Sequence, residues 1–498
     1  MARLIDVEAP TTLSGYEAFV HLAPAVRELR EAAQRLAPAL AGRTLWMVSS
    51  TAQGGGVAEM LPTMIGLLNE LGVTTRWFVI ETERPEFFVL TKRIHNLIHG
   101  AGEPVLTAAD RELFESVSAA NAEALGPMLA HGDVLALHDP QPLGLAPLLR
   151  ARADVRVLWR CHIGLDEELP QTRTAWDFLR PYADACERVV FSAPEYVPDW
   201  LEPRSTIIHP AIDPLGPKNH DLWVHRLTRV MMNSALVHAD LGPVLTPRWE
   251  HVAGRLMPSG EFGPADANGD IGLLSRPIVT QISRWDRLKG FAPLLDAFAL
   301  LKRRLDEGDL DDGDPIHRRR IELARLVLAG PDPASIQDDP EAREVVEQLR
   351  SAYLALPAAI QDDVALLTLP MASREQNALM VNALQRASSL VVQNSLREGF
   401  GLTIVEAMWK QIPVLSNQRA CGPRHQIRDG VDGRLARDPE DVHELSTLLD
   451  AMLAAHAQRE VWGLNAQRRA HADFLVFTQV RRWIELLHEL VTDDAAST

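Results

Sequence analysis

The chain has 498 residues, of which 46% are hydrophobic and 23% charged, a balance typical of globular proteins. This length exceeds what one compact core usually covers and suits two domains. Lys and Arg number 50 against 67 Asp and Glu, which gives a formal net charge of −17 at pH 7. Such acidity argues against nucleic-acid binding, because that affinity comes from basic side chains that neutralise phosphates.

Cysteine usage and the amino terminus bear on the compartment. The cysteines, Cys161, Cys186 and Cys421, are odd in number and far apart, so they predict neither a disulfide framework nor a zinc site. The first ten residues include Asp6 and Glu8 and lack the apolar core of a signal peptide. No stretch approaches the roughly 18 apolar residues of a membrane-spanning helix. We therefore expect a soluble cytoplasmic protein that binds no membrane.

Short β-branched and apolar runs alternate with helical patterns along most of the chain. The runs that predict strands in the first half are Thr44–Ser49, Thr74–Ile80, Asp133–Leu137, Arg156–Trp159, Arg188–Ser192 and Ser205–Ile208. Those in the second half are Pro277–Ile282, Leu326–Ala329, Val364–Leu369, Leu390–Gln393 and Val414–Ser416. Amphipathic stretches such as Val57–Leu71 lie between several of them. This alternation favours an α/β fold whose parallel sheets are covered by helices on both faces.

One segment is typical of a domain boundary. His251–Arg276 is rich in Gly and Pro and lacks helical or strand periodicity, so it reads as a linker. We therefore expect a first domain at 1–270 and a second at 271–472. The remaining residues, 473–498, include an amphipathic helical pattern over Phe474–Leu490 that must pack on one of the two domains.

A second polar stretch, Asp306–Arg320, is acidic and then basic. Its Asp311, Asp312 and Asp314 have the spacing of a metal-binding Asp-x-Asp motif. However, they follow a helical pattern and do not close a strand, which favours a solvated insertion. No metal site is predicted here.

Ligands of open parallel sheets bind beyond the carboxyl ends of the strands. After Thr44–Ser49 come Gly54, Gly55 and Gly56, which let the backbone approach a ligand at the start of a helix. A flexible turn explains the same glycines equally well. Glu59 is as readily a first-turn charge favoured by the helix dipole as a ligand contact.

Two neighbouring strand ends of the first half carry polar side chains. His138 and Asp139 follow one strand and are succeeded by two prolines, a pattern that suits hydroxyl recognition or a plain turn. Arg160 and His162 end the next strand, where a histidine suits contact with a reacting sugar or a structural role. Their occurrence on adjacent strand ends favours function.

In the second half, Arg284 and Lys289 place two cations in one loop after Pro277–Ile282. Opposite a diphosphate, each charge-assisted hydrogen bond contributes roughly 1.5–3 kcal/mol. The alternative is a pair of surface cations. Gly330 follows another strand and either permits close approach of a ligand or forms a plain turn.

The clearest segment is Arg397–Lys410, which follows a predicted strand and opens a helix. Gly399 and Gly401 flank an aromatic residue, and the helix presents its amino end where an anion can bind. Glu398 near this turn suits hydroxyl binding or charge stabilisation. Glu406 suits a ligand contact, but with Thr403 three residues earlier it also fits a capping box.

These residues resemble a known family. Glu398 and Glu406 are similar to the E-x7-E signature of retaining glycosyltransferases that include sucrose- and glycogen-type synthases. Arg284 and Lys289 look like their diphosphate-binding cations, and Gly54–Gly56 looks like their amino-domain glycine loop. The matches run from about residue 44 to residue 440.

Within that family the chain most resembles the trehalose glycosyltransferring synthases. The segments that carry this resemblance are Gly55–Glu59, His138–Pro142, Trp159–His162, Phe191–Tyr196, Pro210–Pro214 and Ser395–Ile412. Fungal-type trehalose phosphorylases share much of the pattern. The chain departs from it after His162, where Gly164 follows Ile163 in place of an acidic residue, and this leaves the acceptor open.

The resemblance implies a GT-B fold, in which two Rossmann-like domains face across a cleft and the terminal helix returns to the first. It implies that the nucleotide binds mainly to the second domain. Glu398 would contact the donor hexose and Glu406 the ribose. Donor contacts would also come from Arg284, Lys289, Gly55, Gly56, Gly330, Gly401, Leu402 and Thr403.

On the acceptor side, the resemblance places His162 near the anomeric centre. It places His138, Asp139 and Arg160 with the sugars. The implied catalytic residues are Glu398, His162, Arg284 and Lys289. No metal ligand set is implied.

The function that follows is reversible transfer of glucose from a nucleoside diphosphate glucose to glucose, which gives α,α-trehalose with retained configuration. No cofactor or protein-bound metal is required. The alternatives are a trehalose phosphorylase, a related retaining enzyme with another acceptor and, least favoured, a non-catalytic sugar-nucleotide sensor. The nucleotide base is left open, and a homodimer is the default expectation for oligomeric state.

Overall fold

The computed structural model describes residues 3–7, 10–52, 56–238, 247–310, 314–333 and 340–492. The chain divides into two compact units, one of Met1–Asp213 with Asp473–Thr498 and one of Pro214–Ala472. Within the described ranges, no helix combines the length and apolar character needed to cross a membrane.

The first unit contains a seven-stranded sheet in the order β1-β3-β2-β4-β5-β6-β7. Its strands are β1 (Arg3–Ile5), β2 (Leu45–Ser49), β3 (Thr75–Val79), β4 (Val134–His138), β5 (Arg156–Arg160), β6 (Arg188–Phe191) and β7 (Ser205–Ile207). Only β1 is antiparallel to its neighbour; the others pair in parallel, so their carboxyl ends share one edge.

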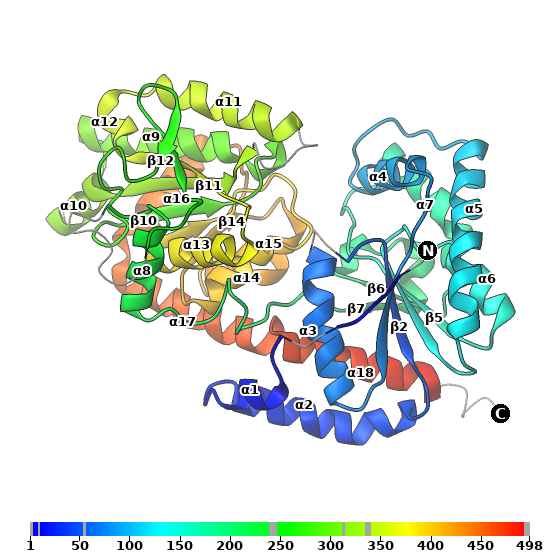
Figure 1. The fold of residues 1–498 in the computed structure, drawn as a ribbon. Helices are drawn as coiled ribbons and strands as arrows, with labels where there is room; N and C mark the ends of the chain where they lie inside the picture. Colours follow the sequence, from blue (N-terminus) through cyan, green and yellow to red (C-terminus); the bar gives the residue numbers. More distant parts are fainter. Residues whose placement is uncertain are drawn as a thin grey trace. The chain divides into compact units, whose positions relative to one another are not determined.

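The first unit also contains α-helices. They are α1 (Leu13–Glu17), α2 (Ala23–Leu36), α3 (Gly56–Glu70), α4 (Glu86–Ile98), α5 (Ala108–Leu125), α6 (Leu145–Arg152), α7 (Pro170–Ala183) and α18 (Val476–Thr492). The last of these comes from the far end of the chain and runs beside α2 (Figure 1). Backbone hydrogen bonds of Ile212 with Phe474 and Val476 anchor its start.

The second unit contains an eight-stranded sheet in the order β15-β14-β13-β10-β11-β12-β8-β9. Its strands are β8 (Gly254–Leu256), β9 (Phe262–Pro264), β10 (Ile278–Ile282), β11 (Arg325–Pro331), β12 (Val364–Leu369), β13 (Leu390–Val392), β14 (Val414–Asn417) and β15 (Gly433–Ala436). The hairpin β8–β9 joins the β12 edge in antiparallel fashion, whereas the other strands are parallel.

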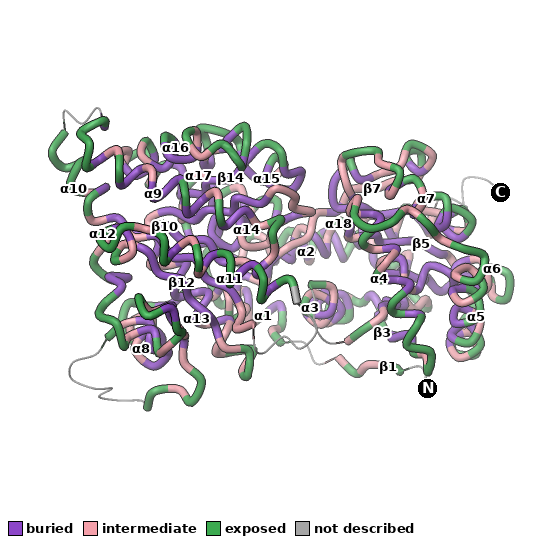
Figure 2. The backbone as a smooth tube through the Cα atoms, turned by 90° about the horizontal axis from the view of Figure 1, so that it is seen from above, coloured by how far each residue is buried: buried purple, intermediate pink, exposed green. Residues whose placement is uncertain are grey.

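Ten helices of the described chain belong mainly to the second unit. They are α8 (Val224–Asn233), α9 (Phe291–Glu307), α10 (Pro315–Leu323), α11 (Pro340–Leu354), α12 (Ala358–Gln361), α13 (Arg374–Ala387), α14 (Leu402–Trp409), α15 (Cys421–Gln426), α16 (Val442–Ala454) and α17 (His456–Asp473). The buried strands β10 and β12 contrast with the largely exposed α10 (Figure 2).

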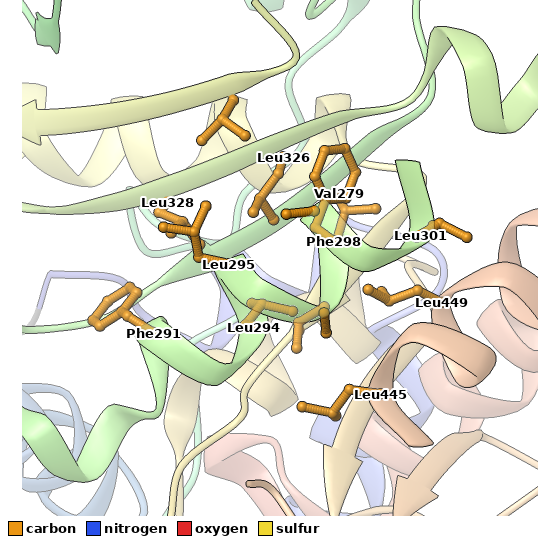
Figure 3. Close-up of a cluster of buried hydrophobic side chains, with 14 of the residues drawn as sticks. Val279, Phe291, Leu294, Leu295, Phe298, Leu301, Leu326, Leu328, Leu445 and Leu449 are labelled. Atoms are coloured by element: carbon orange, nitrogen blue, oxygen red, sulfur yellow. The ribbon is translucent and has the colours of Figure 1, made fainter. Parts of the chain in front are cut away.

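The second sheet has an apolar core on each face, as period-two alternation requires when both faces are covered. Leu326 and Leu328 of β11 join the cluster formed with α9 and α16 (Figure 3). Val327 and Ala329 of the same strand join the cluster formed with α8 and α13. Each fully buried leucine or valine side chain contributes about 1.5–3 kcal/mol by leaving water.

The sequence-predicted strands all occur, with ends within two residues of those expected. The predicted linker His251–Arg276 is wrong, because it contains the hairpin β8–β9. Since this hairpin belongs to the second sheet, the structure divides the chain at Asp213 and not near residue 270.

The insertion predicted at Asp306–Arg320 forms the end of α9 and the start of α10. Asp314 is the N-cap of α10, where its carboxylate accepts the backbone N–H of Ile316. This gives Asp314 a local structural role. Asp311 and Asp312 lie outside the described residues.

Candidate active site

In the second unit, the turn after β10 is fixed by local chemistry. The Asp286 carboxylate accepts the backbone N–H of Leu288 and starts a single 3-10 turn over Arg287–Lys289. Gly290 ends that turn with a left-handed φ of 61°, and a Cβ there would lie 2.1 Å from the carbonyl oxygen of Asn394. Only glycine fits this position, which packs the turn against the segment that follows β13.

This packing brings Lys289 to Glu398. The Lys289 Nζ donates to Glu398 Oε2 over 2.7 Å, and the two side chains are only 15% and 13% exposed. The same oxygen accepts the Ser395 hydroxyl at 2.9 Å and the Gln393 amide at 3.3 Å. Three donors therefore hold one carboxylate at the carboxyl ends of β10 and β13.

Arg284, the other predicted diphosphate-binding cation, is placed differently. Its side chain is 68% exposed, and its guanidinium lies 3.8 Å from the Asp286 carboxylate. An exposed ion pair of this length restrains a side chain weakly. The structure thus places both cations in one loop but engages only Lys289 with Glu398.

The glycine turn before α14 is supported from behind. Gly401 is the N-cap of the helix with φ 83°, a left-handed conformation that favours glycine. Gln426, which is fully buried, donates its side-chain amide to the carbonyl of Phe400 at 2.7 Å. The backbone amides of Leu402 and Thr403 then form the first turn of α14, the end of a helix that attracts anions.

The capping-box interpretation of Glu406 is wrong. The N-cap is Gly401, with no side-chain cap, so Thr403 lies inside the helix. Glu406 sits in the second turn, 6% exposed, and its Oε2 lies 3.4 Å from the amide nitrogen of Gln385. Its carboxylate is therefore positioned by α13 and not by the helix terminus.

Gly330 has a packing reason to be glycine. A Cβ at this position would lie 2.5 Å from the Trp285 ring and 2.7 Å from the Ser283 carbonyl oxygen. Trp285 also donates its indole N–H to the carbonyl of Pro331 at 2.8 Å. Gly330 thus lets the loop that carries Arg284 lie against the end of β11.

In the first unit, β4 and β5 bring two histidines together. The Nδ1 of His138 lies 3.0 Å from the Nε2 of His162. One of these two nitrogens therefore carries a proton and donates it in a hydrogen bond to the other. The Sδ of Met47 lies 3.2 Å from the Nε2 of His138, and the Trp483 ring of α18 stacks on the same imidazole. Burial lowers the pKa of His138 to about 3 and lowers that of His162 as well, which keeps both rings neutral near pH 7.

Asp139 holds the loop that carries His162. Its φ of 66° is left-handed, and its Oδ1 accepts the backbone N–H of His162 at 2.8 Å. Its carbonyl accepts the Trp159 indole N–H, and its own N–H donates to the carbonyl of Arg160. Burial raises the pKa of Asp139 to about 6, although that backbone hydrogen bond and the nearby Arg160 favour the ionised form.

Arg160 is a buried cation whose side chain is partly used in the fold. Its Nη2 donates to the Ile208 carbonyl at 2.8 Å and contacts the Ser192 hydroxyl at 3.3 Å. Its Nη1 is buried and has no hydrogen-bond partner in the described part of the chain. Burial lowers the pKa of Arg160 to about 10, so the guanidinium stays charged near pH 7.

The amino-domain glycines are only partly described. Gly55 lies outside the described residues, whereas Gly56 begins α3. No described atom lies within 4 Å of a Cβ built on Gly56, so the fold itself does not require glycine there.

A cavity of ≈ 1010 Å³ opens beside the ends of β2 and β3 in the first unit. Polar side chains that line it include Ser50, Thr51, Glu81 and Arg84. The amide of Asn121 shapes it by bonding both the N–H and the carbonyl of Glu81. Hydroxyl and carboxylate groups of this kind suit a polyhydroxylated ligand.

Comparison with known proteins now adds to this geometry. A family model described as "Trehalose synthase, N-terminal domain" matches residues 47–198, and one described as "Glycosyl transferases group 1" matches residues 272–469. A trehalose synthase of Pyrococcus horikoshii is 31% identical over 464 residues, which cover 92% of each chain. The chain belongs to the trehalose synthase family of glycosyltransferases.

Two further comparisons concern a more distant relative and the fold. A trehalose phosphorylase of Pleurotus sajor-caju is 28% identical over 79% of this chain but only 50% of its own length. The solved structure of an α,α-trehalose 6-phosphate synthase from Burkholderia multivorans superposes with a TM-score of 0.63 at 15% identity, covering 91% of this chain and 98% of that one. This likeness shows the two-domain GT-B fold of this glycosyltransferase.

Several residues of this glycosyltransferase's site were not predicted from sequence. Gln393 and Ser395 support Glu398. Gln393 is the last residue of the predicted strand Leu390–Gln393 and Ser395 follows it, and this position at a strand end was a usable signal. Met47 and Trp483 contact His138 from β2 and α18, and only the fold brings those elements together.

Proposed function

We propose that this glycosyltransferase transfers glucose from a nucleoside diphosphate glucose to glucose, giving α,α-trehalose with retained anomeric configuration. The observation that carries the proposal is the Lys289–Glu398 pair beside the amino end of α14. It joins a phosphate-binding cation, a sugar-binding carboxylate and an anion-attracting helix terminus. The match to a trehalose synthase, 31% identical over 92% of the chain, supports trehalose as the product.

The second unit would bind the donor. Lys289 and the exposed Arg284 would neutralise the diphosphate, while the backbone N–H groups of Leu402 and Thr403 would donate hydrogen bonds to its oxygens. Glu398, held by Lys289, would then contact hydroxyls of the donor hexose. Glu406 would bind the ribose. Gly401 would let the diphosphate approach the backbone.

The first unit would hold the reacting sugars. A neutral His162 near the anomeric carbon donates to or accepts from a sugar hydroxyl without adding charge. The buried Nη1 of Arg160 is a donor suited to a sugar oxygen, because its Nη2 is used within the fold. Asp139 and His138 would contact sugars as well as order this loop, and the polar cavity beside β2 and β3 suits the acceptor.

The proposed chemistry is front-face substitution. The bond from the anomeric carbon to the diphosphate oxygen breaks while the acceptor hydroxyl bonds to the same face, and its proton passes to the departing phosphate. Catalysis then rests on orientation and on stabilising the phosphate charge by Lys289, Arg284 and the helix terminus. The proposed reaction requires no cofactor and no protein-bound metal.

A donor-by-acceptor matrix tests this proposal. ADP-, UDP- and GDP-glucose would each be incubated with glucose, glucose 6-phosphate, fructose and a no-acceptor control, and product linkage would be assigned by NMR. We expect α,α-trehalose from glucose with at least one donor. A β-linked product, or a product only with another acceptor, would overturn the proposed reaction.

A second candidate is trehalose phosphorolysis, favoured by the 28% identity to a trehalose phosphorylase. Trehalose incubated with inorganic phosphate alone would then release glucose 1-phosphate. Trehalose with a nucleoside diphosphate alone would release nucleoside diphosphate glucose if the first proposal holds. Tight nucleotide binding without turnover of any acceptor would indicate a sugar-nucleotide sensor.

A further inference from the structure

Lys410, at the end of α14, is a lysine buried in the second unit at 6% exposure. Its Nζ donates to three oxygens: the Gln385 side chain at 2.7 Å, the Glu406 carbonyl at 3.1 Å and the Asn219 side chain at 3.2 Å. Three acceptors around one nitrogen match the three N–H donors of an ammonium group.

A neutral amine would break this match, because it has only two N–H donors. Burial lowers the pKa of Lys410 to about 7, while the charge of Glu406 raises it. The same side chain can therefore lose a proton near neutrality. When it does, one of its three acceptors loses its donor.

The shortest of these bonds, from Lys410 to Gln385, fixes the orientation of the Gln385 amide. An ammonium group can only donate, so it binds the oxygen of Gln385 and turns the amide nitrogen the other way. That nitrogen lies 3.4 Å from Glu406 Oε2 and 3.5 Å from the Thr403 carbonyl oxygen. A flipped Gln385 would present its oxygen to the Glu406 carboxylate and repel it.

The other end of the network is tied to the first residues of the second unit. Asn382 of α13 donates to the carbonyls of Pro217 and His220 at 3.0 and 2.9 Å. Arg386 bonds Asp221 at 2.9 Å and the Asn219 carbonyl at 3.2 Å. The Asn219 side chain that meets Lys410 is thus held in place by α13.

We propose that Lys410 is a positioning residue that orients Glu406 through the Gln385 amide and thereby sets the affinity for the nucleotide half of the donor. This rests on the proposed role of Glu406 as the ribose ligand. Lys410 touches no substrate in this account. Replacing Lys410 should therefore change the affinity for the donor and leave kcat, the turnover at saturating donor, nearly unchanged.

Other groups near Lys410 must be separated from it in any pH experiment. The charged neighbours are Glu406 on α14, Arg386 on α13, and Lys218 and Asp221 in the segment before α8. His220 lies on the same segment. His471 of α17 stacks on Trp409 at 6.4 Å. A pH effect that belongs to Lys410 must disappear when Lys410 alone is replaced.

The experiment measures Kd by calorimetry between pH 6 and 8.5, with the full-length protein and no acceptor. The ligand is the nucleoside diphosphate glucose that the wild type binds best. A diphosphate glucose is used because its phosphate diester does not titrate in this range. The variants are Lys410→Met, Gln385→Met, their double variant and Glu406→Gln. The matched control is Lys302→Met, since Lys302 is also buried, also has a lowered pKa and donates to Ile321, Glu322 and Asp363 elsewhere in the unit.

We expect the wild-type Kd to be constant below pH 7 and to rise as Lys410 loses its proton above it. Lys410→Met should raise Kd at pH 6 by about five- to tenfold, the scale of one hydrogen bond, and abolish the rise with pH. Gln385→Met should do the same, and the double variant should be no worse than either, because both act along one path. Lys302→Met should keep the wild-type Kd and its pH dependence.

Four results separate the possible failures. If Glu406→Gln weakens binding but Lys410→Met and Gln385→Met do not, the positioning role is overturned and the proposed function stands. If the increases in Kd caused by Lys410→Met and Gln385→Met add up in the double variant, Lys410 does not act through Gln385, and that part of the inference is overturned. If the wild type binds no nucleoside diphosphate glucose, or Glu406→Gln binds it normally, the proposed donor site is overturned. If Lys410→Met fails to fold, Gln385→Met tests the same route, and a wild-type Kd in that variant overturns the inference.

Discussion

The candidate residues of the first unit and those of the second differ in how they carry charge. In the first unit, His138 and His162 are kept neutral by burial, and the pKa of Asp139 is raised to about 6. In the second unit, Lys289 and Glu398 form a direct ion pair with part of each side chain exposed. The two histidines of the first unit therefore suit neutral hydroxyls, whereas the Lys289–Glu398 pair suits a ligand that brings charge of its own.

This difference follows from where each group lies in its sheet. His138 is the last residue of a central strand and is 1% exposed. Lys289 and Glu398 lie in loops after their strands, where water lowers the cost of keeping charge. The proposed glucosyl transfer from a nucleoside diphosphate needs both environments, one to position a sugar and one to receive the leaving anion.

The largest expected effect is on the charged group. Lys289→Ala should lower kcat/KM for the donor by about 10²–10⁴, because it removes the proposed phosphate contact and leaves Glu398 without its cation. Steady-state kinetics with the best donor would measure this. Arg287→Ala is the matched control, since Arg287 lies in the same turn but pairs with Glu344 at the surface. Equal activity of the two variants would refute the assigned role of Lys289.

A smaller loss is expected at the neutral histidines of the first unit. His162→Gln should lower kcat by about 10², because it replaces an imidazole near the proposed anomeric centre with an amide that cannot match its geometry. His131→Gln is a surface control, since that ring is 84% exposed and pairs with Asp154. A His162→Gln variant with wild-type kcat would place the histidine among structural residues.

Asp139→Asn should separate stability from activity. Since the pKa of Asp139 is about 6 in the fold against an ordinary 3.8, the folded state holds its proton more tightly. Stability therefore falls as pH rises from about 4 to 6 and stays lower above it. Asn keeps the size, accepts the His162 N–H and tolerates φ 66°, so it should stabilise the protein at pH 7.5 by at most ~3 kcal/mol.

Thermal unfolding at pH 7.5 and pH 4 would measure this effect. The gain should shrink toward pH 4, where Asp139 is largely protonated. Activity of Asp139→Asn should fall about tenfold if the carboxylate contacts a sugar, a loss on the scale of one hydrogen bond to a charged group. A gain in Tm that is equal at both pH values would show that the carboxylate is not the destabilising group.

The sequence predicted those parts of the fold and site that depend on local pattern. Lys289 and Glu398 follow buried strands, and parallel pairing brings such strand ends together without knowledge of the rest. Glu406 fitted a capping box by spacing, but Gly401 starts the helix two residues earlier than that interpretation requires. The hairpin β8–β9 was missed because its three-residue strands carry no alternation among many glycines.

Contacts between distant elements could not be predicted in the same way. Lys410 meets Gln385 from another helix and Asn219 from 191 residues away, and no local periodicity encodes either contact. Trp483 reaches His138 because α18 returns to the first unit. The helical pattern predicted that α18 must pack on something, but its partner depends on the fold.

The smallest effect is expected at the support of Glu398. Ser395→Ala removes one neutral donor at 2.9 Å but leaves Lys289 and Gln393 in contact with the same oxygen. A single neutral hydrogen bond contributes about 0.5–1.5 kcal/mol, so kcat/KM for the donor should fall only about three- to tenfold. Ser446→Ala, another fully buried serine in the same unit, controls for packing loss and should leave kcat/KM unchanged. A loss at Ser395 as large as that at Lys289 would mean that the hydroxyl itself contacts the donor, and the charge carried by the second unit would then matter less than its hydrogen bonds.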